Sequence, residues 1–189
     1  AAALIRQAHP DWSSKQIKTA LISTARAEVK VNQQPASPFE QGAGMLDIPA
    51  AINAALTFES GSYAHGACVA SCSFTNVVTN VSDTAQSWTV DIQLDDPQAT
   101  FTLQQQSLTL AKANTSGASA NLAFSIDTSD VENGKWVFGR VEFRQGNSVS
   151  QQLPIAVFAN DNSDTRALSS NLSVAQNGDL SATTRVRNI

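Results

Sequence analysis

The chain has 189 residues, a formal net charge of −4 and only 15% charged residues. Because the sequence has no block of Lys and Arg residues, it predicts no binding to a nucleic-acid phosphate backbone. No apolar run approaches the ~20 residues that a membrane-spanning helix needs, which predicts no membrane span. Charged residues are few while Ser, Thr, Asn and Gln are abundant, and this composition suits a secreted protein.

The first 25 residues predict two helices in close succession. Ala1, Leu4, Ile5 and Ala8 recur at the helical spacing i, i+3, i+4 and i+7, so one face of the first helix is apolar. Pro10 ends this helix, because proline lacks a backbone N–H donor and disfavours helical geometry in the residue before it. The first helix has no start signal, so we expect the chain to begin inside a helix.

A second helix is predicted to begin directly after this proline. Ser13 is the expected N-cap, since Gln16 follows three residues later at the spacing of a capping box. Trp12 precedes the cap and Ile17 is the fourth helical residue, which is the spacing of a hydrophobic staple. We therefore interpret Ser13 and Ser14 as capping residues and not as nucleophiles.

A further helix is predicted after a polar, proline-bearing loop at residues 29–38. Asp47 can cap this helix, and Pro49 is tolerated in its first turn. Ile48, Ile52 and Leu56 repeat at i, i+4 and i+8, so they form an apolar stripe that must pack on a core.

Two stretches of this region carry a family resemblance. They read AALIRQAHPDWSSKQIKTALISTA, at residues 2–25, and FEQGAGMLDIPAAINAAL, at residues 39–56. In this order and spacing they resemble the C-terminal end of a subtilisin-like serine protease catalytic domain. In that family the nucleophilic serine lies in a Gly-Thr-Ser-Met-Ala motif, at the start of the helix whose last turns match residues 1–7. The resemblance implies that the catalytic Asp, His and Ser lie upstream of Ala1, so no catalytic residue is expected in this chain.

Between residues 57 and 160 the hydrophobic period changes from 3.6 to 2. Trp88, Val90, Ile92 and Leu94 alternate with polar residues, as strands with one buried face do. Strands are also predicted at residues 73–81, 101–104, 107–111, 122–126, 137–143 and 148–158. Turn-forming pairs separate them, namely Ser82-Asp83, Asn133-Gly134 and Gly146-Asn147. About seven short strands at this spacing predict a two-sheet antiparallel sandwich.

The run CSFTNVVTNVSDTAQSWTV, at residues 72–90, is similar to the first two strands of the fibronectin type III-like module that follows the catalytic domain in many larger subtilisin-like proteases. The predicted fold class is mostly β, an antiparallel fibronectin III-like β-sandwich preceded by a short α-helical block from the end of an α/β catalytic domain. Residues 1–56 are the incomplete catalytic-domain helices and residues 57–160 the sandwich. Residues 161–189 are a linker or the start of a further β module, with a hairpin predicted around Asn177-Gly178.

Cys68 and Cys72 are the two cysteines of the chain. They could be free thiols or form a local disulfide, and the resemblance to secreted proteases favours the disulfide. A structural zinc site needs four ligands, and only His65 lies nearby, so neither a metal nor a cofactor is predicted.

Other polar residues have simple structural interpretations. His9 falls in the His-Pro-Asp-Trp turn between the first two helices, where the family resemblance gives it no catalytic role. The pairs Asp95-Asp96 and Asp161/Asp164 could serve calcium, but neither has the spacing of a calcium loop, so acidic turns are favoured.

The three tryptophans are interpreted as core residues, with a surface patch for sugar or peptide binding as the alternative. Trp12 is explained by the helix staple and Trp88 by the inward face of its strand. Trp136 has the opposite parity from Val137, and Phe138 shares its side. The strand at residues 137–143 is therefore expected to be covered on both faces, by residues 1–56 or by the tail.

The favoured interpretation is a C-terminal fragment of a secreted subtilisin-like serine endopeptidase. On this hypothesis the parent protein cleaves protein substrates, while this chain alone is inactive and serves as an accessory scaffold for the upstream catalytic domain. The alternative is a non-enzymatic extracellular adhesion or binding module to which the helices belong. Helices without the sheet that they cover in the family would expose apolar stripes, so they are expected to pair in a homodimer, to swap, to fold back on Trp136 and Phe138, or to be disordered.

Overall fold

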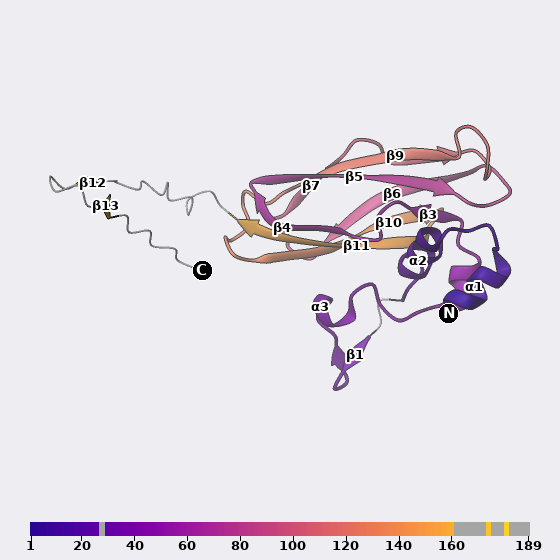
Figure 1. Ribbon diagram of the computed structural model, residues 1–189, viewed down its shortest axis with the longest axis horizontal. Helices are drawn as coiled ribbons and strands as arrows, with labels where there is room; N and C mark the ends of the chain where they lie inside the picture. The colour runs from indigo at the N-terminus through magenta and orange to yellow at the C-terminus, as the bar shows by residue number, and fades with distance from the viewer. Residues whose placement is uncertain (27–28, 161–172, 175–179, 182–189) are drawn as a thin grey trace.

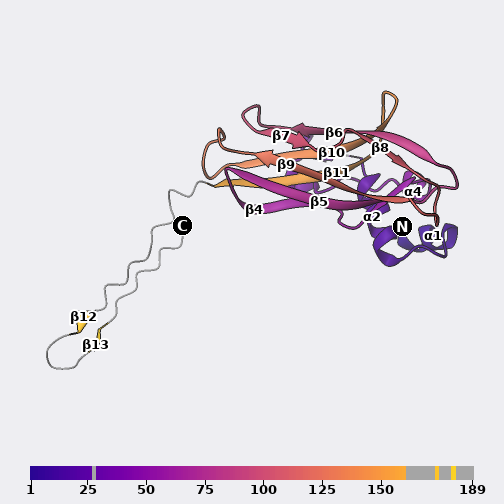
Figure 2. The same ribbon diagram turned by 90° about the horizontal axis from the view of Figure 1, so that it is seen from above.

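The computed structural model of the protein describes residues 1–26, 29–160, 173–174 and 180–181. Two β-sheets pack face to face, and a group of short helices lies against one end of them (Figure 1). Seen from above, α1, α2 and α4 gather at the same end of the sandwich (Figure 2). The mostly β, sandwich-like fold with a few short helices confirms the fold class predicted from the sequence.

One sheet has five strands in the order β4-β11-β10-β6-β8, and the other has four in the order β3-β5-β9-β7. The five-stranded sheet contains β4 (Tyr63–Val69), β11 (Ser148–Asn160), β10 (Trp136–Gln145), β6 (Gln86–Leu94) and β8 (Ser107–Leu110). The four-stranded sheet contains β3 (Leu56–Phe58), β5 (Ser71–Asn80), β9 (Ser119–Asp127) and β7 (Thr100–Leu103). Each stretch with the predicted alternation is a strand in the structure.

Strands β3 and β4 were not among those predicted. β4 pairs with β11 in parallel register, with Tyr63 opposite Ile155 and His65 opposite Val157, so the five-stranded sheet is mixed and not purely antiparallel. Residues 64–67 of β4 are small or polar and all exposed, and they show no alternation. Hydrophobic period therefore gave no signal for this strand.

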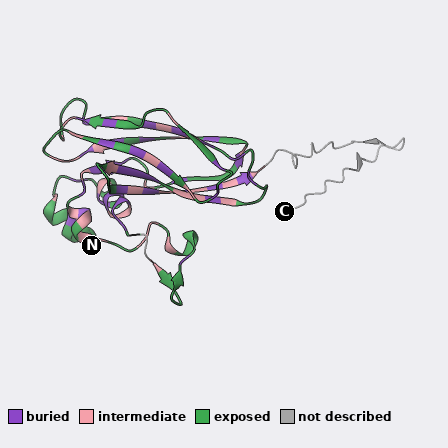
Figure 3. Ribbon diagram, turned by 180° about the vertical axis from the view of Figure 1, so that it is seen from behind, coloured by how far each residue is buried: buried purple, intermediate pink, exposed green. Residues whose placement is uncertain are grey.

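Side chains of one parity fill the space between the two sheets. Buried residues alternate with exposed or partly buried ones along the strands of the sandwich (Figure 3). The alternation is regular along β6, β9 and β11. Removal of this apolar surface from water is the main stabilising term of the fold. The largest buried side chains of this core are Trp88, Phe143, Leu56, Leu108, Leu110, Leu122, Ile126 and Leu153.

The helical segment contains α1 (Ala2–Ala8), α2 (Ser14–Ser23), α3 (Pro38–Gln41) and α4 (Ile48–Ile52), with a two-stranded ribbon of β1 (Lys30–Val31) and β2 (Gln34–Pro35). The capping box predicted for α2 is present. Ser13 N donates to Gln16 Oε1 over 2.8 Å, and Gln16 N donates to Ser13 Oγ over 3.2 Å. Asp47 Oδ1 caps α4 by accepting from Ala50 N over 3.0 Å. None of the helices in the described ranges is both long and apolar enough to cross a bilayer.

The helices share a small apolar core of their own, made of Ile5, Trp12, Ile17, Ala20, Ala51 and Ala54. The His9 ring stacks on Trp12 at a centroid distance of 3.9 Å, and its Nε2 lies 2.7 Å from the carbonyl oxygen of Ile52. Leu4 and Leu46 remain about half exposed, at 50% and 52%. The helices therefore cover one another only in part.

A buried glutamine of β11 joins the helices to the sandwich. Gln151 Oε1 accepts from Leu56 N over 2.7 Å, and Gln151 Nε2 donates to Leu56 O over 2.8 Å and to Ser23 Oγ over 2.7 Å. Beside it, Phe58 N donates to Thr19 Oγ1 over 3.2 Å. One side chain thus links α2, β3 and β11.

In the tail, β12 (Ser173–Val174) and β13 (Leu180–Ser181) pair antiparallel, as the predicted hairpin requires. The predicted Asn177-Gly178 turn, together with Asp161 and Asp164, lies outside the described residues.

Gly139 of β10 lies where the backbones of β10 and β6 approach closely. A Cβ at this position would lie 2.2 Å from the backbone oxygen of Gln93. We expect Gly139→Ala to lower the free energy of unfolding by about 3 kcal/mol, because a backbone oxygen inside a ladder cannot move aside freely. Urea unfolding measures this loss.

Gly66 of β4 provides the matched control. A Cβ there meets no atom within 4 Å, so Gly66→Ala should change the free energy of unfolding by less than about 0.5 kcal/mol. Equal losses for the two variants would contradict the close approach of β10 to β6.

The Gln151 link gives a second stability prediction. Gln151→Ala should lower the free energy of unfolding by about 3 kcal/mol, because it leaves the buried N–H and C=O groups of Leu56 without partners. The neighbouring Gln152 makes one longer bond, from its Nε2 to Ala25 O over 3.3 Å, and serves as the control. Thermal unfolding measures the stability of both variants. If Gln152→Ala lowered the stability as much as Gln151→Ala, the link would be contradicted.

Candidate functional site

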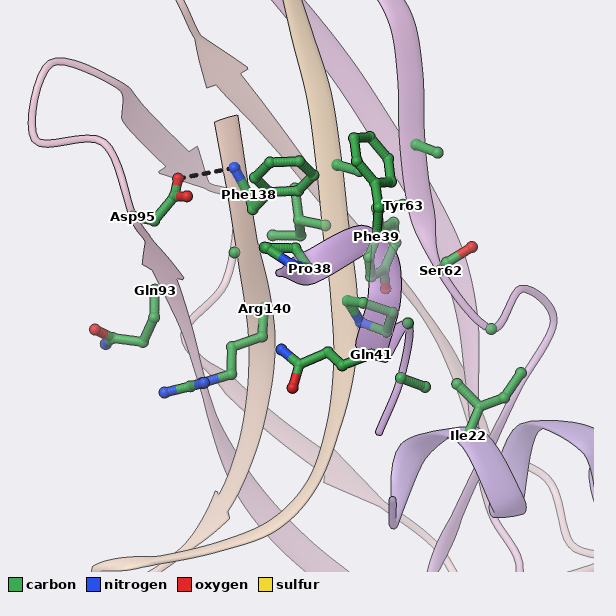
Figure 4. Close-up of a pocket in the computed structure, with 18 of the residues that line it drawn as sticks. Ile22, Pro38, Phe39, Gln41, Ser62, Tyr63, Gln93, Asp95, Phe138 and Arg140 are labelled. Carbon is green, nitrogen blue, oxygen red and sulfur yellow. Dashed lines mark hydrogen bonds between the residues drawn. The ribbon is translucent and has the colours of Figure 1, made fainter. Parts of the chain in front are cut away.

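A groove of about 680 Å³ lies between the outer face of the five-stranded sheet and the loop that carries α3. We call it the outer groove. Its floor includes Phe138, Pro154 and Ala156, and its walls come from α3 and α2. The side chains of Phe39 and Phe138 lie toward one end, and those of Gln41 and Arg140 toward the other (Figure 4).

The floor of the outer groove is apolar because β10 carries large side chains on both faces. Val137 and Val141 point into the core, while Trp136 and Phe138 have the other parity and lie on the outer face. The Trp136 ring also contacts Phe158 of β11, with centroids 5.1 Å apart. An apolar outer face of this kind is unfavourable unless something covers it.

The cover comes from the α3 loop, within residues 1–56, which was one of the expected alternatives. The Phe39 ring meets Trp136 at 5.1 Å and Phe138 at 4.9 Å between centroids, edge-on in both pairs. Such T-shaped contacts are a favoured aromatic geometry. Phe39 is nevertheless 64% exposed, so it covers the patch without filling the groove.

The α3 loop is closed at its base by two backbone hydrogen bonds, from Arg26 N to Met45 O and from Met45 N to Arg26 O, each 2.9 Å long. At its tip, Glu40 Oε2 accepts from Ser37 N over 2.9 Å and from Ser37 Oγ over 2.7 Å. These two bonds hold the pKa of the Glu40 carboxyl below its ordinary value. The capping box fixes α3 and thereby the position of Phe39.

Three charged residues of the described ranges line the groove, namely Lys18, Asp95 and Arg140, and Glu142 and Arg144 are joined to Arg140 outside it. Arg140 Nε donates to Glu142 Oε1 over 2.7 Å, and Arg144 Nη2 lies 2.5 Å from Glu142 Oε2, so two guanidinium groups share one buried carboxylate. Asp95 Oδ1 accepts from the backbone N–H of Phe138 over 2.8 Å. Lys18, on the helical wall, forms no ion pair with any described residue.

The predicted cysteine pair links two strands, because Cys68 lies in β4 and Cys72 in β5. A disulfide joins Cys68 and Cys72, whose Cα atoms are 5.4 Å apart. It spans the turn at Ala70, a residue with φ of 57°. In the described part of the chain, no group of three or more His, Cys, Asp or Glu residues is placed to hold a metal ion, and His65 lies on exposed β4.

The acidic pair Asp95-Asp96 is bound by groups of the protein itself. Asp96 Oδ1 accepts from Gln98 N over 2.9 Å, and its Oδ2 lies 2.7 Å from Lys135 Nζ. The bond to Lys135 is the main cause that lowers the pKa of the Asp96 carboxyl. These contacts agree with the interpretation as an acidic turn.

Sequence reasoning found some of these residues and missed others. Trp12 and Trp88 are buried, as their spacing predicted, and Trp136 and Phe138 share the outer face. Phe39 was missed, because its partners lie about a hundred residues away in the chain. The Arg140, Glu142 and Arg144 cluster could have been found from its spacing of two residues along one strand face.

No family model matches the chain. Subtilisin-like protease SBT1.3 of Arabidopsis thaliana is 37% identical over 68 residues, which are 32% of this chain and 9% of that protein. The chain therefore spans less than a tenth of the curated relative that it matches. This similarity shows a distant link to a subtilisin-like protease.

Several solved structures are similar to part of this chain, all with TM-scores of 0.40 or less. The match to the PapD-like domain of human CEP192 spans 70% of this chain and 98% of that domain, with 10% identity and a TM-score of 0.40. The match to the secreted serine protease VesC from Vibrio cholerae spans 56% of this chain and 23% of VesC, with 11% identity and a TM-score of 0.37. The match to WR4, an MSP family member of C. elegans, spans 56% of this chain and 98% of WR4, with 7% identity and a TM-score of 0.36.

Tyr63 is the one tyrosine of the sequence, and it lines the groove. Its hydroxyl predicts how the stability of the protein depends on pH. Burial raises the pKa of its hydroxyl to about 12, although a bond from Asn76 Nδ2 acts in the opposite direction. Since an unfolded tyrosine ionises near pH 10, stability from this shift is present below pH 10 and lost between about pH 10 and 12. The expected loss is about 3 kcal/mol.

Ultraviolet absorbance of tyrosinate follows Tyr63 directly in the folded protein. The variant Tyr63→Phe should lose this component of the alkaline destabilisation, and urea unfolding at a series of pH values measures the difference. Ionisation at the ordinary pH of an exposed tyrosine would contradict the burial of this hydroxyl.

Proposed function

We propose that this chain is the region that follows the catalytic serine in a secreted subtilisin-like serine endopeptidase. Residues 1–56 are the last helices of the catalytic domain, residues 57–160 form a fibronectin type III-like sandwich, and residues 161–189 form a linker or the start of a further module. The observation that carries the proposal is the 37% identity to a subtilisin-like protease over 68 residues. The disulfide is compatible with an extracellular location.

In this proposal the parent protein hydrolyses peptide bonds with an Asp, His and Ser that lie upstream of Ala1. A serine nucleophile needs a positioned base within hydrogen-bond reach. Among the described residues, neither His9 nor His65 makes a hydrogen bond with a serine hydroxyl. We therefore expect no peptidase activity from this chain alone.

The sandwich has the role of a scaffold in this proposal. The buried amide of Gln151 ties α2 and β3 to β11, and Ile22 of α2 packs against the main core. A sandwich fixed in this way would move as one body with the helices. It would stabilise the catalytic domain or restrict the approach of large protein substrates.

A second candidate is a non-enzymatic extracellular binding module that includes the helices. The partly filled, apolar outer groove supports it, because exposed apolar surface of this kind marks interaction sites. The two candidates differ in whether the complete protein is an enzyme.

Peptidase assays on two proteins test the proposal. This chain should release no product from an unstructured protein substrate such as casein. A protein extended upstream through a Gly-Thr-Ser-Met-Ala motif should cleave casein, and replacement of the motif serine by alanine should abolish cleavage. An inactive but folded extended protein would favour the binding module, and activity of this chain alone would refute the fragment hypothesis.

A further inference from the structure

We infer that the outer groove binds a peptide segment in which an aromatic residue stands next to a carboxylate. The inference goes beyond the proposed function and does not depend on it, since every residue concerned lies in this chain. It rests on the shape of the floor, on the position of Phe39 and on the charges at the walls.

The floor is hollow because large and small side chains stand side by side across three strands. Phe138 of β10 is opposite Ala156 of β11, and Ala156 is opposite Ala64 of β4. All three residues line the groove. Two alanines beside a phenylalanine leave a depression on a sheet face, and Phe138 forms one side of it.

Phe39 shows which chemistry this surface accepts. Its ring sits edge-on against Trp136 and Phe138 while 64% of it stays exposed. An incoming aromatic side chain can lie over Ala156 and contact both Phe39 and Phe138, which would bury the two rings further. Aromatic rings also give large contact area with few torsions to order.

The charges at the walls favour a carboxylate on the same ligand. Lys18 is cationic and has no ion-pair partner among the described residues. Arg140 is paired with Glu142, but Arg144 shares that carboxylate, so the three side chains together keep a net positive charge. Among the described residues, Asp95 is the one carboxylate that lines the groove, and it already accepts the N–H of Phe138. An acidic peptide is therefore complementary to this surface, and a basic peptide is not.

The size of the groove suits a short segment. A volume of about 680 Å³ lies in the range of pockets that enclose small ligands. The occupant to which we commit is a segment of a few residues from another protein.

Fluorescence anisotropy with labelled peptides tests the inference on the whole chain. The probe is the hexapeptide Ser-Pro-Phe-Glu-Glu-Ser, and the matched peptides replace Phe by Ala, or both Glu by Gln. Loss of the aromatic ring should weaken binding at least about tenfold. Loss of the carboxylates should weaken it about threefold, with the difference disappearing at high salt.

Variants of the protein locate the binding. Phe138→Ala should remove most of the affinity. Ala156→Phe fills the hollow and should also remove most of the affinity, so it serves as the test if Phe138→Ala fails to fold. Lys18→Gln should match the loss seen with the glutamine peptide, while Lys112→Gln, an exposed lysine outside the groove, should change nothing.

Three results would overturn the inference. The first is equal binding of the phenylalanine and alanine peptides. The second is full affinity in a folded Ala156→Phe variant. The third is a dimer, seen by sedimentation, that dissociates in this same variant, because the groove would then be an interface between copies. Each readout is independent of peptidase activity, so failure here leaves the proposed function untouched.

Discussion

The join between the helices and the sandwich depends on one buried amide, in a position where an apolar residue would ordinarily stand. Gln151 lies on the inward parity of β11, in series with the buried Leu153, Ile155 and Val157. A polar side chain there is costly unless its groups are hydrogen-bonded. Its amide accepts from Leu56 N and donates to Leu56 O, so it pairs with that residue as a neighbouring strand would. Its second N–H reaches α2, and this geometry joins three elements that are distant in sequence.

Most of the fold could be predicted because local patterns specified it. The alternation around Trp88 predicted β6, and the Ser13 capping box predicted the start of α2, since both signals lie within one element. Strand β4 could not be predicted in this way. It is held by parallel pairing with β11, almost a hundred residues later, and its own residues 64–67 carry no period. Pairing between distant strands leaves no local trace when the strand itself is small and polar.

The candidate site follows the same division. The parity of Trp136 and Phe138 predicted that β10 has a second apolar face, and only the structure shows which residue meets it. Phe39 stands in a short helical turn that a capping box explains completely, so its sequence context gives no hint of a distant aromatic partner. The hydrophobic period and the spacing of residues in the sequence cannot predict a long-range contact made by one exposed ring.

Strands β10 and β11 carry the core on one face and the outer groove on the other. Val141 and Phe143 are fixed by the packing between the sheets, where a change of volume is costly. Phe138 and Ala156 face the groove and are only partly buried, so they can change with little effect on that packing. Stability and the binding that we infer are thus assigned to opposite faces of the same two strands. Substitutions on the outer parity can report on the groove while the inner parity keeps the sandwich intact.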